Sequence, residues 1–201
     1  MAKKKQLPIQ PGDADVGVAV LSGDAFYFHA EQFVKYAAPQ FSSAGQRAAT
    51  SIGEMIASAT SLALSVEIYM KALLLQRGCA VPKTHELPDL FSNLPTPVQQ
   101  QVESAYERLR AAEGPGTAEF VVHISRSPGA PPSFARGTQA PNLSLRSVLR
   151  RSSSAFVTWR YLFAHPLTES GAPLVYEFLR LGFAAQAIRE QLGTVALSAR
   201  T

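Results

Sequence analysis

The chain has 201 residues, of which 46% are hydrophobic and 17% are charged, and its mean hydropathy is +0.02. These values exclude a largely disordered chain and predict one ordinary domain with its own hydrophobic core. The net charge of +4 is a mild excess, and three of the positive charges belong to Lys3, Lys4 and Lys5, so charge by itself favours an RNA partner only weakly.

The cysteine content and the apolar runs bear on where the protein works. Cys79 is the one cysteine in the chain and therefore cannot form an internal disulfide. A lone cysteine is typical of a reducing compartment, so we expect a cytoplasmic protein. Pro8 and Pro11 interrupt the apolar stretch that a signal peptide requires, and the run at residues 16–21 is far shorter than the roughly 20 residues that span a bilayer. The sequence predicts neither export nor a membrane-spanning segment.

The N-terminal part of the chain shows two patterns. Residues 1–23 have no sustained hydrophobic period and are predicted to form a flexible arm. Residues 24–37 place aromatic side chains at a spacing of three to four, which predicts a first helix.

The clearest pattern in the chain is a central helix. Apolar residues occupy one helical face from Ile52 to Leu73, over six turns. Ser51 and Glu54 have the spacing of a capping box at its start, and Gly78 suits its end. We predict a core helix around which the rest of the domain packs.

The next segments combine short helices with a long irregular stretch. A short helix is predicted over residues 84–94, capped by Thr84, and a further helix starts at Thr96 and stops before Gly114. Residues 113–141 lose the helical period and collect proline and glycine, which predicts a long insertion loop. Within this loop only residues 120–124 have the character of a strand.

The C-terminal part returns to helical periodicity. Residues 143–164 and 174–192 each carry an apolar stripe at helical spacing and are predicted as the last two helices. The expected fold class is therefore all-α, a bundle of four to six helices with an up-down core, forming a single domain over residues 24–195.

Several enzyme signatures are absent from the sequence. It has no Walker A motif, no GxGxxG after a strand, no HExxH, no CxxC pair and no GxSxG. The four histidines have no metal-ligand spacing, and no acidic cluster would complete a site. We expect neither a metal nor a cofactor.

A recognisable pattern lies at the end of the central helix. Glu67, Tyr69 and Lys71 are followed by an Ala-Leu-Leu run, the helix ends at Gly78, and a Thr-His-Glu-Leu turn at residues 84–87 precedes a short apolar helix. This pattern resembles the HEPN superfamily, the "higher eukaryotes and prokaryotes nucleotide-binding" helical domains. The resemblance implies a HEPN-like helical bundle that forms a homodimer. HEPN members include ribonucleases, toxin components and non-catalytic binding modules.

The ribonucleases of this superfamily carry an arginine followed, after four to six residues, by a histidine. Here Arg160 is followed by His165 with four residues between them. The resemblance implies metal-independent RNA cleavage at a dimer interface, in which His165 handles a 2′-hydroxyl proton and Arg160 stabilises the phosphate charge. A toxin or phage-defence role would add an antitoxin or another protein as a partner.

A structural interpretation of the same two residues stays open. Arg160 could pack beside Trp159 and pair with an acidic side chain, and His165, which precedes Pro166, could be a cation at a helix C-terminus. The chain would then be a non-catalytic HEPN-like nucleotide-binding or protein-interaction module.

Three further arginines lie on the helix predicted over residues 143–164. Arg146, Arg150 and Arg151 could follow a nucleic-acid backbone, although a solvated helix face explains them equally well. His85 is interpreted as a turn residue that bonds the backbone.

Overall fold

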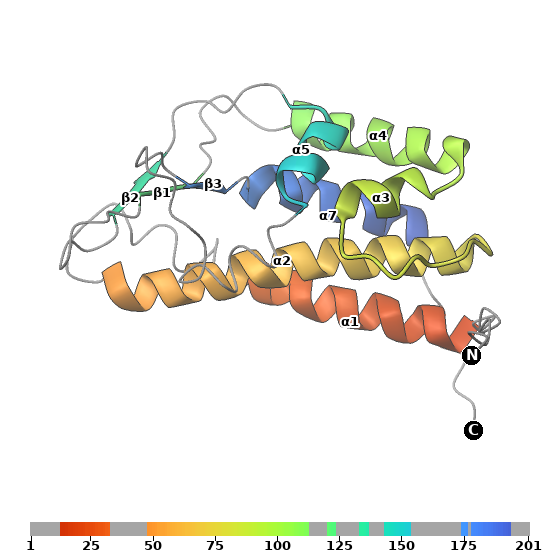
Figure 1. Ribbon diagram of the computed structural model, residues 1–201, viewed down its shortest axis with the longest axis horizontal. Coiled ribbons are helices and arrows are strands. Elements are labelled where there is room, and N and C mark those ends of the chain that lie inside the picture. Colours follow the sequence, from red (N-terminus) through yellow and green to blue (C-terminus); the bar gives the residue numbers. More distant parts are fainter. Residues whose placement is uncertain are drawn as a thin grey trace, which may run out of the picture.

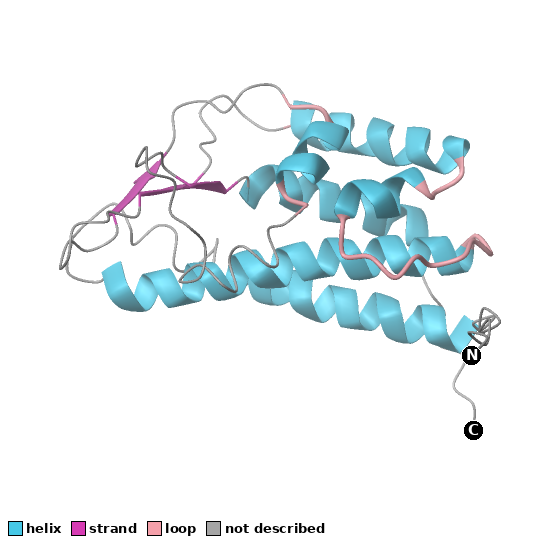
Figure 2. Ribbon diagram, viewed as in Figure 1, coloured by secondary structure: helices cyan, strands magenta, loops and turns pink. Residues whose placement is uncertain are grey.

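The structure is a computed structural model of the chain, and it describes residues 13–32, 48–112, 120–123, 133–136, 143–153, 174–176 and 178–193. Helices dominate this part of the chain, with one small sheet at one end (Figure 2). The helices are α1 (Asp13–Gln32), α2 (Ala48–Gln76), α3 (Leu87–Ser92), α4 (Thr96–Ala111), α5 (Leu145–Arg151) and α7 (Phe178–Leu192). The strands are β1 (Phe120–His123), β2 (Ser133–Arg136) and β3 (Leu174–Tyr176).

The four long helices form an up-down bundle. Along the chain, α1, α2, α4 and α7 alternate in direction, and α2 lies between α1 and α7 (Figure 1). Helix α4 packs on the other side of α7, while the short helices α3 and α5 pack against each other. The predicted helical bundle is therefore confirmed.

Helix α2 supplies the centre of the hydrophobic core. Leu62, Val66, Tyr69 and Leu73 are each no more than 1% exposed, so the predicted apolar face is the buried face. Full burial of one such side chain stabilises the fold by about 1.5–3 kcal/mol. Gly78 follows the helix with a φ of +66°, a conformation that glycine adopts without steric cost.

The start of α2 differs from the prediction. The helix begins at Ala48, so Ser51 and Glu54 lie inside it and the predicted capping box is wrong. Alanine is the best helix former, and the run Ala48-Ala49 extends the helix by one turn before the first apolar residue of the stripe.

Helix α1 also begins earlier than predicted. Its first residue is Asp13, so residues 13–23 are helical and the predicted flexible arm is too long. Val16 and Val20 are buried against the core, whereas Val18 and Leu21 are exposed to 62% and 50%. Because apolar residues lie on both sides of this helix, the sequence shows no single hydrophobic stripe.

A shared carboxylate ties three of the long helices together. The Tyr69 hydroxyl of α2 donates to Asp24 Oδ1 of α1 at 2.7 Å, and Arg189 Nε of α7 donates to the same oxygen at 2.7 Å. Arg189 also reaches Asp24 Oδ2 at 3.2 Å. This arrangement needs close approach of α1 and α2, which Gly23 permits: a Cβ at this position would lie 2.5 Å from the Tyr69 ring.

The sheet corrects two predictions. Its strand order is β2-β1-β3, with β1 antiparallel to both neighbours. The strand expected at residues 120–124 is confirmed as β1, but β2 lies in the part of the predicted insertion loop that was expected to be irregular. Residues 174–176 form β3 instead of the first turn of the last helix, because Leu174, Val175 and Tyr176 pair with β1. The short segment has strand propensity, and only its tertiary partner decides between helix and strand.

Helix α5 is shorter than the helix predicted over residues 143–164. It begins after Ser144, whose hydroxyl accepts from the Ser147 backbone N–H, and it ends at Arg151. Ser152 and Ser153 form a turn, which is consistent with the weak helix propensity of a serine run. The rest of the predicted helix, from residue 154 onward, lies outside the described residues.

One stretch of α2 is long and apolar enough to cross a membrane. It covers Ile56–Gln76 and meets this criterion by length and composition only, so the prediction that no segment crosses a membrane stays a prediction. However, 67% of its most apolar part is buried inside the protein. Burial between α1 and α7 accounts for this composition, as expected of a core helix.

Candidate functional site

A buried carboxylate on α2 anchors a polar cluster. Glu67 is 4% exposed, and it accepts a hydrogen bond of 2.6 Å from Lys71 Nζ one turn along the helix. The imidazole Nδ1 of His85 lies 2.9 Å from the same oxygen, Glu67 Oε1. Burial of an unpaired carboxylate is costly, so these two partners explain why a charged side chain is tolerated here.

The loop between Gly78 and α3 positions His85 in this cluster. The Thr84 hydroxyl accepts from the Glu86 backbone N–H at 3.0 Å, a local turn that fixes the residues on either side of His85. The His85 side chain is 68% exposed although its Nδ1 contacts a buried carboxylate. The prediction of a turn residue gave no sign of this contact with Glu67.

The contact between Glu67 and His85 also suits proton transfer. A carboxylate that accepts from Nδ1–H holds the imidazole in one orientation and in the tautomer that leaves Nε2 to exchange protons. A histidine with a carboxylate behind it is the usual arrangement of a general acid or base. The Glu67–His85 pair is therefore the best candidate for proton transfer among the residues that the structure describes.

The end of α5 lies beside this pair. The Ser153 hydroxyl donates to the Glu86 carboxylate, which adjoins His85 in the chain. Ser153 is also the last described residue before the segment that contains Arg160 and His165. Both of these predicted catalytic residues lie outside the described residues, so their catalytic roles stay predictions.

The three arginines predicted to bind nucleic acid lie on α5, and they differ from one another. Arg146 is held by neighbours: its Nε donates to Glu103 at 2.7 Å, one of its terminal nitrogens donates to Gln99 at 2.7 Å, and its guanidinium lies 5.0 Å from the Phe91 ring centroid. These contacts join α5 to α3 and α4, so Arg146 serves packing.

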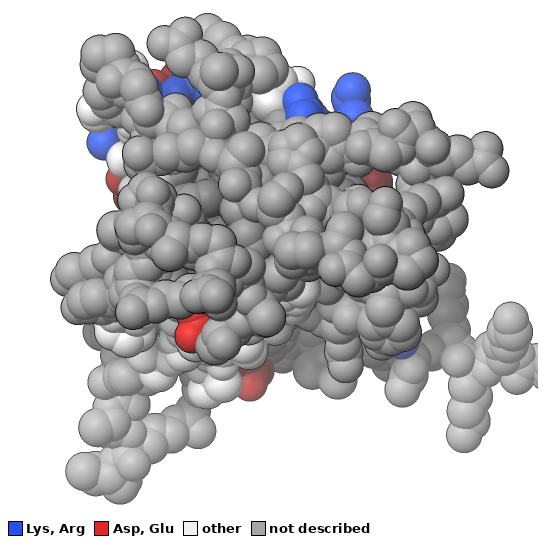
Figure 3. Space-filling model, turned by 90° about the vertical axis from the view of Figure 1, so that its left-hand side faces the viewer, with Lys and Arg blue, Asp and Glu red and all other residues white. Residues whose placement is uncertain are grey.

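Arg150 and Arg151 are exposed near the end of α5. Figure 3 looks at the end of the molecule, and most of the described Lys and Arg atoms visible there lie in its upper half, the side on which α4 and α5 lie in Figure 1.

Metal binding has no support in the described part of the chain. No group of three or more His, Cys, Asp or Glu side chains is arranged there to hold a metal ion. His29 Nδ1 instead lies 3.1 Å from the Ser61 hydroxyl, a contact between α1 and α2.

Comparison with known families decides what kind of domain holds this cluster. The family model of the HEPN domain matches residues 30–115. The chain contains a HEPN domain. The match covers α2, α3 and α4, and with them Glu67, Lys71 and His85. Comparison with curated proteins and with solved structures gives no match. The predicted HEPN resemblance is confirmed over these residues.

The HEPN match does not extend to Arg160, His165 or the arginines of α5. Their roles stay predictions. The Glu67–His85 contact was missed because the two residues are 18 positions apart and meet only through the loop after Gly78. The signal that could have found it was the resemblance itself, since both residues belong to the HEPN-like pattern at the end of α2.

Proposed function

We propose that this HEPN-domain protein is a metal-independent endoribonuclease of toxin or phage-defence type, with Arg160 and His165 as its catalytic residues. The observation that carries the proposal is the HEPN domain at residues 30–115 followed, in the same chain, by the Arg-x4-His spacing. The Ser153–Glu86 contact adds support, because the chain enters the segment containing Arg160 beside the Glu67–His85 pair.

The proposed chemistry uses only side chains of the protein. His165 takes the proton of a ribose 2′-hydroxyl, whose oxygen attacks the adjacent phosphorus. Arg160 stabilises the charge that develops on the phosphate oxygens, and the bond to the 5′-oxygen breaks. The products are a 2′,3′-cyclic phosphate and a 5′-hydroxyl end, with the leaving oxygen taking up a proton.

The proposal assigns different roles to the three arginines of α5. Arg150 and Arg151 are the expected contacts for the RNA backbone, since both are exposed. Arg146 does not belong with them, because Glu103, Gln99 and Phe91 already hold its guanidinium.

A homodimer and a restraining protein partner are part of this proposal. The exposed apolar side chains Val18 and Leu21 lie one turn apart on α1 and offer surface for association. Light scattering of the purified protein measures the oligomeric state, and Leu21→Glu is expected to weaken any association through this helix. Cytoplasmic localisation stays a prediction from the lone cysteine.

A second candidate function is a non-catalytic HEPN-like nucleotide-binding or protein-interaction module. The engagement of Arg146 in packing favours it, because one of three predicted phosphate contacts is thereby explained structurally. In that case the exposed arginines are solvated and the chain cleaves nothing.

The nature of the RNA ends distinguishes these functions. Wild-type protein is incubated with RNA in EDTA, and the product ends are identified by mass spectrometry. The ribonuclease proposal expects 2′,3′-cyclic phosphate ends, a large loss of rate in Arg160→Ala and a smaller loss in Arg160→Lys, which keeps the charge. Intact RNA after incubation with folded, dimeric wild-type protein supports the binding module.

A further inference from the structure

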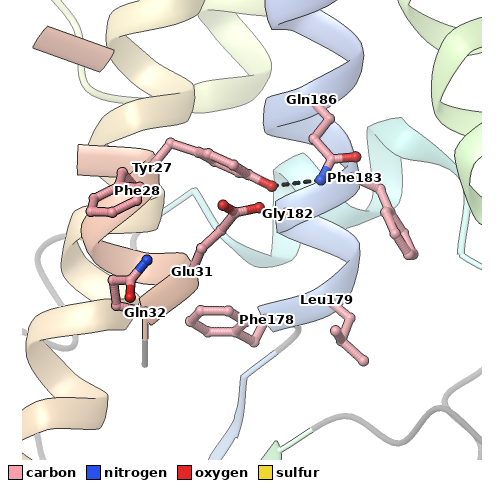
Figure 4. Close-up of a pocket in the computed structure, with 9 residues that line it drawn as sticks. All are labelled: Tyr27, Phe28, Glu31, Gln32, Phe178, Leu179, Gly182, Phe183 and Gln186. Atoms are coloured by element: carbon pink, nitrogen blue, oxygen red, sulfur yellow. Dashed lines mark hydrogen bonds between the residues drawn. The ribbon is translucent and has the colours of Figure 1, made fainter. Parts of the chain in front are cut away.

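A pocket of about 440 Å³ opens between α1 and α7 (Figure 4), and neither Glu67 nor His85 lines it. Its size lies in the range that binds small molecules in proteins, roughly 300–1,000 Å³. Tyr27 and Glu31 line it from α1, and Phe178, Gly182 and Gln186 line it from α7. Neither the HEPN pattern nor the proposed ribonuclease chemistry uses these side chains.

The shape of the pocket is set by rigid elements. Gln186 Nε2 donates to the Tyr27 hydroxyl at 2.5 Å, which joins the two helices across the pocket. Burial raises the pKa of Tyr27 well above its ordinary value of 10, and the neighbouring Glu31 adds to this shift, so the hydroxyl stays neutral. The pocket is therefore preformed between two helices of the bundle.

The floor of the pocket is helix backbone. A Cβ built on Gly182 would meet no atom of the described residues within 4 Å, so a side chain at this position would enter the space of the pocket. Phe178, one turn before Gly182, is 4% exposed and packs its ring at the base, below the Glu31 carboxylate in Figure 4. Phe28, which also lines the pocket, is 61% exposed, an unusual position for so large an apolar side chain.

The described side chains that line the pocket carry negative charge and no positive charge. Among the described residues that line the pocket, Glu31 is the only charged one, and four others are aromatic: Tyr27, Phe28, Phe178 and Phe183. Asp24 of α1 and Arg189 of α7 form an ion pair with each other, and neither lines the pocket. An exposed carboxylate that lies between the Tyr27 and Phe178 rings (Figure 4) attracts organic cations by Coulomb and cation–π forces, and it repels phosphates and carboxylates.

We infer that this pocket binds a small organic cation, an amine or quaternary ammonium group carried on an apolar or aromatic body. The cationic group pairs with Glu31, and the apolar body lies over Phe178 and the Gly182 backbone. This site is independent of the proposed ribonuclease function, because neither the charge of Glu31 nor the apolar lining of the pocket involves Arg160 or His165.

Benzyltrimethylammonium is the probe, with benzyl alcohol and benzoate as neutral and anionic analogues. Isothermal titration calorimetry on the full chain is expected to give saturable binding of the cation at millimolar concentration or below, weaker binding of the alcohol and none of benzoate. Glu31→Gln keeps the shape of the side chain and removes its charge, so it should weaken binding of the cation roughly tenfold. Gly182→Leu should abolish binding by filling the pocket.

Glu107→Gln is the matched control, because Glu107 is an exposed glutamate on α4 outside the pocket. It should bind the cation like wild type. Each variant is checked by circular dichroism; if Gly182→Leu does not fold, Glu31→Gln decides, since its side chain is exposed and its fold is secure. The inference is overturned if wild type shows no saturable binding up to about 10 mM. It is equally overturned if the alcohol binds as well as the cation, or if Glu31→Gln binds the cation like wild type.

Discussion

Glu67 Oε1 lies 2.9 Å from His85 Nδ1, so a buried carboxylate of the core helix holds an imidazole that is itself 68% exposed. The two partners should therefore respond differently to substitution. Glu67→Gln removes the charge that Lys71 and His85 share and should lower the free energy of unfolding by about 1–3 kcal/mol. His85→Ala should cost about 1 kcal/mol or less, because the imidazole is 68% exposed and Lys71 still bonds to Glu67.

Urea unfolding of the two variants measures this difference. Equal destabilisation by both substitutions would contradict the larger contribution assigned to the buried carboxylate.

The substitution of glycine by alanine should have opposite effects on stability at two positions. Gly23→Ala places a methyl group 2.5 Å from the Tyr69 ring, which should destabilise the protein by about 1–3 kcal/mol through overpacking. Gly182→Ala meets no atom within 4 Å and should stabilise it by about 0.5–1 kcal/mol through helix propensity. Thermal unfolding compares the two variants with wild type. A Gly23→Ala protein as stable as Gly182→Ala would contradict the close packing of α1 on Tyr69.

The Asp24 carboxylate predicts a pH dependence of stability. Burial raises the pKa of Asp24, but hydrogen bonds from Arg189 and Tyr69 outweigh burial, so the pKa lies below its ordinary value of 3.8. A carboxylate with a lowered pKa in the folded state stabilises the fold above the unfolded pKa, and this contribution is lost as the pH falls below 3.8.

Asp24→Asn removes this contribution. At neutral pH the variant should be less stable than wild type by about 1 kcal/mol or less, since the ion pair with Arg189 is partly exposed. Below pH 3.8 the two proteins should converge. Urea unfolding at a series of pH values measures the difference, and a constant difference across that range would contradict the assignment.

The arginines of α5 should divide into two classes. Arg146→Ala should lower stability, by about 1–2 kcal/mol, because it removes contacts with Glu103, Gln99 and Phe91. Arg150→Ala should leave stability unchanged and weaken RNA binding, with a smaller salt dependence. Filter binding at several salt concentrations and urea unfolding separate the two effects. Weaker RNA binding by Arg146→Ala at unchanged stability would reverse this assignment.

Most of the helical core could be predicted from the sequence, but the elements whose conformation depends on contacts with distant parts of the chain could not. The apolar face of α2 follows from local periodicity, and five residues of the predicted stripe are buried: Ala59, Leu62, Val66, Tyr69 and Leu73. Strand β3 was predicted as helix, because residues 174–176 take their conformation from pairing with β1. The early start of α1 was missed because Val18 and Leu21 lie on its exposed face and blur the hydrophobic stripe.

The candidate site was predictable only in part. The helical period placed Glu67 and Lys71 on one helix, where a spacing of four residues brings them together. The contact of Glu67 with His85 depends on the path of a loop, and the contact of Arg146 with Glu103 spans 43 positions. Contacts of this kind follow from tertiary packing, which local periodicity does not encode.

The measurement that tests the central claim most directly is the rate of RNA cleavage in EDTA by wild type, His165→Ala and His29→Ala. His29 is an exposed control on α1 whose imidazole contacts Ser61, far in the chain from the Arg-x4-His motif. The proposal predicts cleavage by wild type and His29→Ala, and a loss of about 100-fold or more in folded His165→Ala. Cleavage by His165→Ala at the wild-type rate would contradict it.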